Sequence, residues 1–123
     1  MVTLIEIPIY NRNIIVGSDC TCAEYTEWIK TTLECGDSID TILDTVNELF
    51  ADDRSYKAST VNMQNAGLLL HFRDKSPGVV AHEVFHIAHA VLDDAGVRLS
   101  FKSDEAFAYL IEYLVTEISE VLK

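Results

Sequence analysis

The segment from Pro77 to Ala95 restricts the fold of this chain more than any other part of the sequence. It is apolar around most of its circumference, it follows Ser76 as a possible N-cap, and Gly96 comes directly after it. These signals predict one long helix with defined ends. A helix that is apolar on most sides is normally buried. We therefore expect this helix to lie in the middle of the domain.

Polar residues interrupt the apolar surface of this helix, and His82, Glu83 and His86 stand closest together among them. The two histidines are one turn apart on the same face, so their imidazole nitrogens can reach one zinc ion at about 2.0–2.1 Å. Glu83 sits beside the metal without binding it, and it can take a proton from a water whose pKa zinc lowers toward about 7. The His-Glu-x-x-His pattern therefore predicts a Zn²⁺ cofactor, with His82 and His86 as ligands and Glu83 as the catalytic base.

A catalytic zinc usually has three protein ligands and one position left for water. Glu105 is the predicted third ligand, since 18 residues separate it from His86 and it falls in the first turn of the last predicted helix. Asp104 is the alternative, although it can also serve as an N-cap. His89 lies about 10 Å from His82 along the helix axis, too far for both to bind one ion, so we expect it in the core or next to the ligands.

The rest of the chain alternates between strand-like and helix-like segments. In chain order, the predicted elements are strands at 2–10 and 14–16, helices at 22–34 and 39–50, strands at 57–63 and 67–72, and helices at 77–95 and 104–121. No internal repeat or linker divides them, and 123 residues suit a single domain that spans 1–123. The expected fold class is α+β: a small, mostly antiparallel sheet packed on the His-Glu-x-x-His helix and the C-terminal helix, with the helical region 22–50 covering another side.

The net charge of −11 argues against binding to nucleic acids or to an anionic membrane surface. No apolar run approaches transmembrane length, and the N-terminal segment lacks the basic region and cleavage site of a signal peptide. Cys20, Cys22 and Cys35 are an odd number with irregular spacing, unlike a disulfide framework. We therefore expect a cytoplasmic protein. Its oligomeric state does not follow from the sequence.

His82, Glu83, His86 and Glu105 resemble the motif of the gluzincins, the thermolysin-like and aminopeptidase-like zinc peptidases whose third ligand is a glutamate on a following helix. The resemblance covers residues 67–114, and the chain as a whole looks like the small single-domain zincin-like proteins of phages and mobile elements. It implies a minimal zincin-like fold, zinc bound by the two histidines and Glu105, and Glu83 as general base. It also implies that the strand at 67–72 lies along the cleft edge, where a peptide or protein substrate adds as another strand.

Two features of the larger gluzincins have no obvious counterpart in this chain. Those enzymes stabilise the oxyanion with a His or Tyr from a second lobe, and here His71, Tyr109 and Tyr56 are the candidates for that role. Thermolysin-like enzymes also place an Asp four residues after the ligand Glu, a position that Tyr109 occupies here, so the contacts behind the ligands must be arranged differently.

Three hypotheses about function follow from these residues. The first is a zinc-dependent peptidase in which metal-activated water attacks a peptide bond with Glu83 as general base. The alternative is a catalytically inactive zincin-like binding module, which keeps a structural zinc and acts through a protein partner. A weaker third hypothesis is zinc-dependent hydrolysis of a non-peptide bond, such as an amide in a small molecule.

Overall fold

A mixed sheet organises the part of the chain that the computed structural model describes, which is residues 1–33, 39–51, 56–63 and 67–123. In chain order the elements are β1 (Val2–Ile7), the short 3-10 helix η1 (Pro8–Tyr10), β2 (Arg12–Ser18), α1 (Cys22–Thr32), α2 (Ile39–Ala51), β3 (Ala58–Asn62), β4 (Leu68–Phe72), α3 (Pro77–Asp94) and α4 (Asp104–Val121). The strand order is β1-β2-β4-β3, with a parallel β2–β4 pair between two antiparallel pairs. The α+β class is confirmed over these residues: four strands and four α-helices form one small domain.

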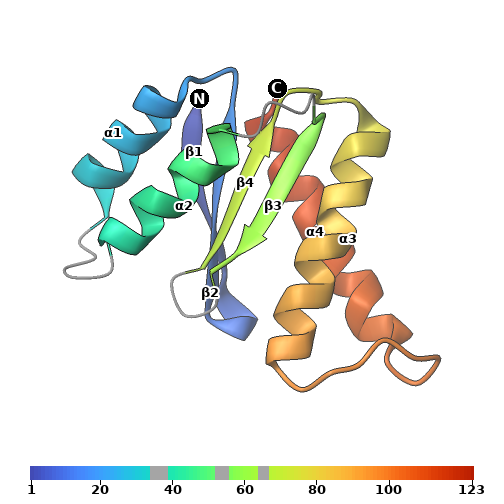
Figure 1. Cartoon of the computed structure of the whole chain (residues 1–123). Coiled ribbons are helices and arrows are strands. Elements are labelled where there is room, and N and C mark those ends of the chain that lie inside the picture. The colour runs from blue at the N-terminus through green and yellow to red at the C-terminus, as the bar shows by residue number, and fades with distance from the viewer. Residues whose placement is uncertain (34–38, 52–55, 64–66) are drawn as a thin grey trace.

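The helices cover the two faces of the sheet in pairs, α1 and α2 on one face and α3 and α4 on the other (Figure 1). The central strands sort their side chains by alternation. In β4, Leu68, Leu70 and Phe72 belong to the core under α3 and α4, whereas Leu69 belongs to the core under α1 and α2. Both predicted helical coverings of the sheet are therefore present.

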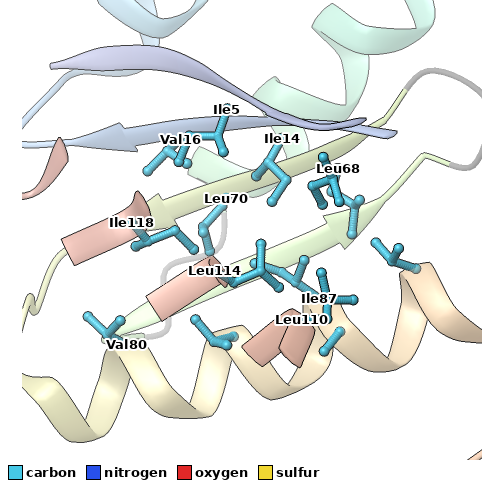
Figure 2. Close-up of a cluster of buried hydrophobic side chains, with 14 of the residues drawn as sticks. Ile5, Ile14, Val16, Leu68, Leu70, Val80, Ile87, Leu110, Leu114 and Ile118 are labelled. Atoms are coloured by element: carbon cyan, nitrogen blue, oxygen red, sulfur yellow. The ribbon is translucent and has the colours of Figure 1, made fainter. Parts of the chain in front are cut away.

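The larger core lies between the sheet and the C-terminal helix pair (Figure 2). Leu70 of β4, Ile87 of α3 and Leu114 of α4 are fully buried in it. Burial of one such side chain contributes about 1.5–3 kcal/mol to the free energy of unfolding. This core fixes α3 and α4 against the sheet and so determines which side of α3 remains open to solvent.

α3 has one side open to solvent, and the prediction that it lies in the middle of the domain is wrong. Val84 and Ile87 point into the core, but His82, His86 and His89 are exposed. His89, expected in the core or beside the ligands, stacks at the surface on Phe85, with the ring centroids 6.2 Å apart. The sheet and α4 cover two sides of the helix, and no further layer of the described chain covers the third.

β3, and not β4, is the edge strand beside α3. The resemblance implied that the strand at 67–72 lies along the cleft edge, yet β4 pairs with β2 on one side and with β3 on the other. All five residues of β4 are buried, as expected for an interior strand. β3 carries the polar residues Ser59, Thr60 and Asn62, which suit a strand with one open edge.

Some predicted features fall outside the described residues, namely Glu34, the predicted last residue of the first helix, and Cys35. Cys20 and Cys22 are described, and both are free thiols. In the described ranges, no helix combines the length and the apolar character needed to cross a membrane. Gly96 has φ of +81° directly after the last turn of α3, which is the helix end that the sequence predicts.

Candidate functional site

His82 and His86 face each other on the exposed side of α3. Their Nε2 atoms are 3.1 Å apart, and the two rings meet at 72°. Two nitrogens bound to one tetrahedral zinc at about 2.0–2.1 Å lie about 3.3–3.4 Å apart. The helix therefore brings two ligand atoms almost to the separation that zinc requires, and both side chains are free to adjust because they are exposed.

Glu83 lies between the two histidines in sequence but points toward the sheet. It is only 5 % exposed, and its Oε2 accepts a hydrogen bond from the Thr60 hydroxyl of β3 at 2.5 Å. The 100° step between successive helical residues accounts for the different directions of Glu83 and His82. The sequence analysis missed Thr60, because a threonine in a weakly predicted strand gives no signal of its own.

Two adjoining hollows follow the boundary between β3 and α3, and together we call them the β3–α3 groove. One has a volume of about 510 Å³ and is lined by His82, and the other has a volume of about 380 Å³ and is lined by His86. Glu83 and Ala58 line both hollows. The three residues of the His-Glu-x-x-His motif therefore open onto one continuous groove along the edge strand.

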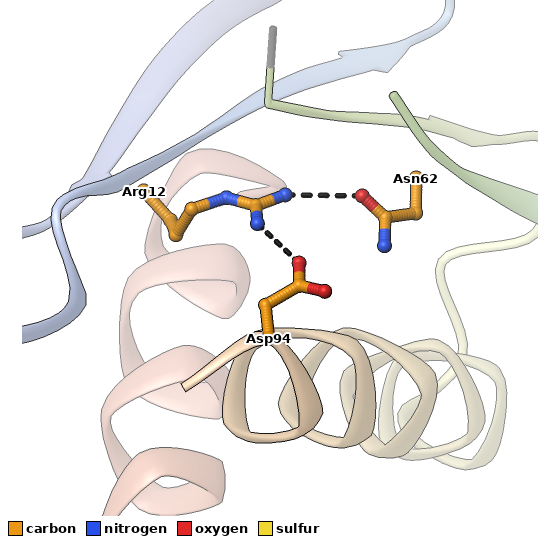
Figure 3. Close-up of polar contacts among 3 residues, drawn as sticks. All are labelled: Arg12, Asn62 and Asp94. Carbon is orange, nitrogen blue, oxygen red and sulfur yellow. Dashed lines mark hydrogen bonds and ion pairs between the residues drawn. The ribbon is translucent and has the colours of Figure 1, made fainter. Parts of the chain in front are cut away.

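Polar contacts tie β3 to its surroundings at both ends of this groove. Near the C-terminal end of α3, the Arg12 guanidinium forms an ion pair with Asp94 and donates to Asn62 Oδ1 at 3.0 Å (Figure 3). At the other end, the backbone N–H groups of Arg73 and Asp74 donate to the Lys57 carbonyl, each at 2.8 Å. The Arg12 contacts join the end of β3 to the end of α3, and the Lys57 contacts join the start of β3 to the segment that follows β4.

Glu105 is not brought to the histidine pair. It is exposed in the first turn of α4, next to Asp104, which is exposed as well. The ring of Phe107 lies beside His89, so α4 begins alongside the C-terminal half of α3, beyond His86. Among the described residues, no three His, Cys, Asp or Glu side chains come together in a group that could hold a metal ion.

None of the three candidates for oxyanion stabilisation lines the two hollows of the β3–α3 groove. His71 belongs to β4 but points to the α1–α2 face, where its Nδ1 is 3.0 Å from the Tyr56 hydroxyl. Tyr109 lines a separate hollow between η1 and α4. Side chains alternate across a strand, so His71, which follows Leu70 in β4, points to the opposite face of the sheet from Leu70.

His71 has an environment that favours the neutral imidazole. Its side chain is buried and packs against the Phe50 ring at 4.5 Å between centroids. This burial, and then the nearby positive charge of Arg73, hold the pKa of His71 below its ordinary value of 6.5. The unfolded chain therefore binds a proton at this histidine at a higher pH than the folded chain does.

We expect the folded state to lose stability as the pH falls through about 6.5, because protons then bind preferentially to the unfolded chain. The contribution of His71 to the free energy of unfolding is complete above that pH and decreases below it. Chemical denaturation of the wild type and of His71→Gln between pH 7.5 and 5.5 measures this contribution. The wild type should lose more unfolding free energy over this range than the variant, and parallel losses would contradict the assignment to His71.

No known family, curated protein or solved structure matches this chain. The arrangement of His82, Glu83 and His86 along the β3–α3 groove is therefore the observation from which a function has to be argued.

Proposed function

We propose that this chain is a zinc-dependent peptidase of the gluzincin type, with His82 and His86 as two of the metal ligands and Glu83 as general base. The observation that carries the proposal is the 3.1 Å separation of the two Nε2 atoms on the open side of α3. Paired imidazoles at this distance suit a borderline-soft divalent ion such as zinc.

Zinc would supply Lewis acidity and would lower the pKa of a water to near neutrality. The remaining work falls to residues of the chain. Glu83 lines both hollows of the groove, so its carboxylate can accept a proton from a water that lies beside a peptide there. The hydrogen bond from Thr60 holds this carboxylate in one orientation, which supports a role in positioning the base.

An extended peptide is the substrate that best suits the groove. β3 is an edge strand of the described sheet, and an extended segment can add to a sheet at such an edge. A segment that paired there would run past Glu83, with His82 lining one hollow and His86 the other. The groove is bounded by one strand and one helix, so we expect it to bind short extended segments.

Glu105 remains the proposed third ligand, with Asp104 as its alternative. Both residues are exposed on the first turn of α4, which packs against α3. The proposal requires that one of these carboxylates moves toward His86 when the metal binds. Replacement of each in turn by alanine separates the two candidates, since only the true ligand should weaken zinc binding.

Zinc titration of the purified chain tests the metal site directly. We expect His82→Ala and His86→Ala each to weaken zinc binding by more than about a hundredfold, since even residues behind the ligands contribute about 10–100-fold. His89→Ala is the matched control, because His89 is exposed on the same helix and should have no effect. Equal zinc affinities for all three variants would overturn the proposed site.

The alternative function is a binding module with a structural zinc and no catalysis. One observation favours it: none of the three candidate oxyanion donors lines the β3–α3 groove. In that case chelation should unfold the protein, and a quenched-fluorescence peptide library should remain uncut by the zinc-loaded chain. Cleavage of any member of the library, lost on chelation, would favour the peptidase.

A further inference from the structure

Another hollow lies between η1 and α4, and we call it the η1–α4 groove. Its volume is about 410 Å³. Ile9 and Tyr10 line it from η1, and Tyr109, Leu110 and Tyr113 line it from α4. It shares no lining residue with the β3–α3 groove, so whatever it binds is independent of the proposed peptidase site.

The walls of this groove are held in place by the fold. Leu110 is part of the buried core beneath it, and the Tyr113 hydroxyl donates to the Glu6 carbonyl of β1 at 2.6 Å, which joins α4 to the strand that precedes η1. Pro8 begins η1, and Asn11 ends it with φ of +51°. The groove is therefore formed before any partner arrives, which lowers the entropic cost of binding.

Two large apolar side chains stand at its rim in contact with solvent. Ile9 is 88 % exposed and Tyr109 is 69 % exposed. Contiguous exposed apolar surface of this kind marks interaction sites more often than scattered single residues do. A bulky apolar side chain from a partner could enter the groove and remove both residues from water.

The surroundings of the groove are acidic. α4 carries five carboxylates, Asp104, Glu105, Glu112, Glu117 and Glu120, and no basic residue, and the segment 2–10 carries Glu6 and no basic residue. Partial burial raises the pKa of the Tyr113 hydroxyl, and the charges of Glu117 and Glu6 raise it further. Glu117 follows Tyr113 by one turn of α4, so it lies on the same side of the helix as this wall. An apolar floor with an acidic rim is complementary to an apolar side chain flanked by cations.

We propose that the η1–α4 groove binds a cationic segment of a partner protein, in which one bulky apolar side chain fills the hollow and flanking lysines or arginines face Glu117 and the other carboxylates of α4. The exposed ring of Tyr109 offers the same cations an aromatic face. A second copy of this chain is a poor occupant, because its net charge of −11 opposes self-association, and the same charge opposes an anionic lipid surface.

A set of fluorescein-labelled peptides with a central tryptophan or leucine between pairs of lysines is the probe. Fluorescence anisotropy should show binding of these peptides to the full chain, and the affinity should fall as salt is added. Peptides with glutamate in place of lysine, or with a central alanine, should bind at least about tenfold more weakly. Equal affinities across the set, or no binding of any lysine-flanked peptide, would overturn the proposal.

Variants of the rim place the binding on the groove. Ile9→Ser and Tyr109→Ser should each weaken binding by about tenfold and leave the fold intact, because both side chains are mostly exposed. Leu99→Ser and Phe101→Ser are matched controls, since these apolar residues are also exposed but do not line the groove, and they should have no effect. Binding that is lost in the controls and retained in the rim variants would refute the assignment.

Three further measurements separate this proposal from its rivals. In sedimentation, the chain alone should not self-associate through this groove, and it should not bind anionic vesicles through Ile9. Self-association or vesicle binding that Ile9→Ser abolishes would identify a different occupant and overturn the proposal. His86→Ala should bind the lysine-flanked peptides as the wild type does. A failed test of zinc binding would therefore leave the peptide-binding result unchanged. A failure to bind these peptides would likewise leave the proposed metal site unchanged.

Discussion

Replacement of Glu83 by Gln should abolish peptide cleavage and leave zinc binding intact. Gln keeps an amide oxygen that can accept the hydrogen bond from Thr60, so the side chain should remain in the β3–α3 groove. It cannot accept a proton from water, and the loss of a general base lowers turnover by a factor on the order of 10³. Cleavage of a quenched-fluorescence peptide, measured beside the zinc content of the same sample, gives both quantities.

Glu27→Gln provides the control, because Glu27 is an exposed glutamate on α1, in the helical layer on the other side of the sheet. It should cleave as the wild type does. If Glu83→Gln also turned over at the wild-type rate, Glu83 would not be the base and the peptidase mechanism would fail. If Glu83→Gln lost zinc together with activity, its role would be structural, and the binding-module hypothesis would gain support.

Gly17→Ala should destabilise the fold by about 2–4 kcal/mol. A methyl group on Gly17 would lie 2.4 Å from Cε2 and 2.6 Å from Cδ2 of the Tyr25 ring. That ring is fully buried, and its hydroxyl is within hydrogen-bond distance of the Ile15 and Leu70 carbonyls, at 2.9 and 3.2 Å. The ring cannot move aside without breaking these contacts, so the cost combines overpacking with a lost buried hydrogen bond.

Thermal unfolding measures this effect, and we expect a decrease in Tm of roughly 10 °C for a domain of this size. Gly78→Ala is the matched control, since a methyl group at Gly78 meets no atom of the described chain within 4 Å. Alanine there should leave stability unchanged or raise it by up to about 1 kcal/mol, because it favours the helical conformation of α3. Similar Tm values for the two variants would show that Tyr25 is not locked in place.

Local features of this fold could be predicted from the sequence, and non-local ones could not. The bounds of α3 follow from Pro77 and Gly96, which act within one turn of the helix ends. The position of β4 inside the sheet depends on its parallel pairing with β2, where Leu68 lies opposite Ile14. No periodicity along the chain encodes that pairing, so the sequence could not correct the resemblance, which implied that the strand at 67–72 lies along the cleft edge.

The candidate site divides in the same way. The separation of His82 and His86 follows from helix geometry alone, and so the pair was predictable. Thr60 reaches Glu83 from a strand that lies 23 residues away in sequence, and only the packed sheet brings them together. The place of Glu105 depends on the path of the connection between α3 and α4, which the spacing of acidic residues does not specify.

The parallel β2–β4 pair has a consequence for the order in which the protein assembles. β3 and β4 are neighbours in the chain and pair as an antiparallel hairpin, whereas β4 must find β2 across the intervening chain that forms α1 and α2. Contacts between residues so distant in sequence close slowly, whereas a helix forms within microseconds. β3, β4 and α3 follow one another in the chain, so the β3–β4 hairpin and α3 can form the β3–α3 groove, including the contact of Thr60 with Glu83, before β4 pairs with β2. The parallel pair should therefore be among the last contacts of the molecule to close.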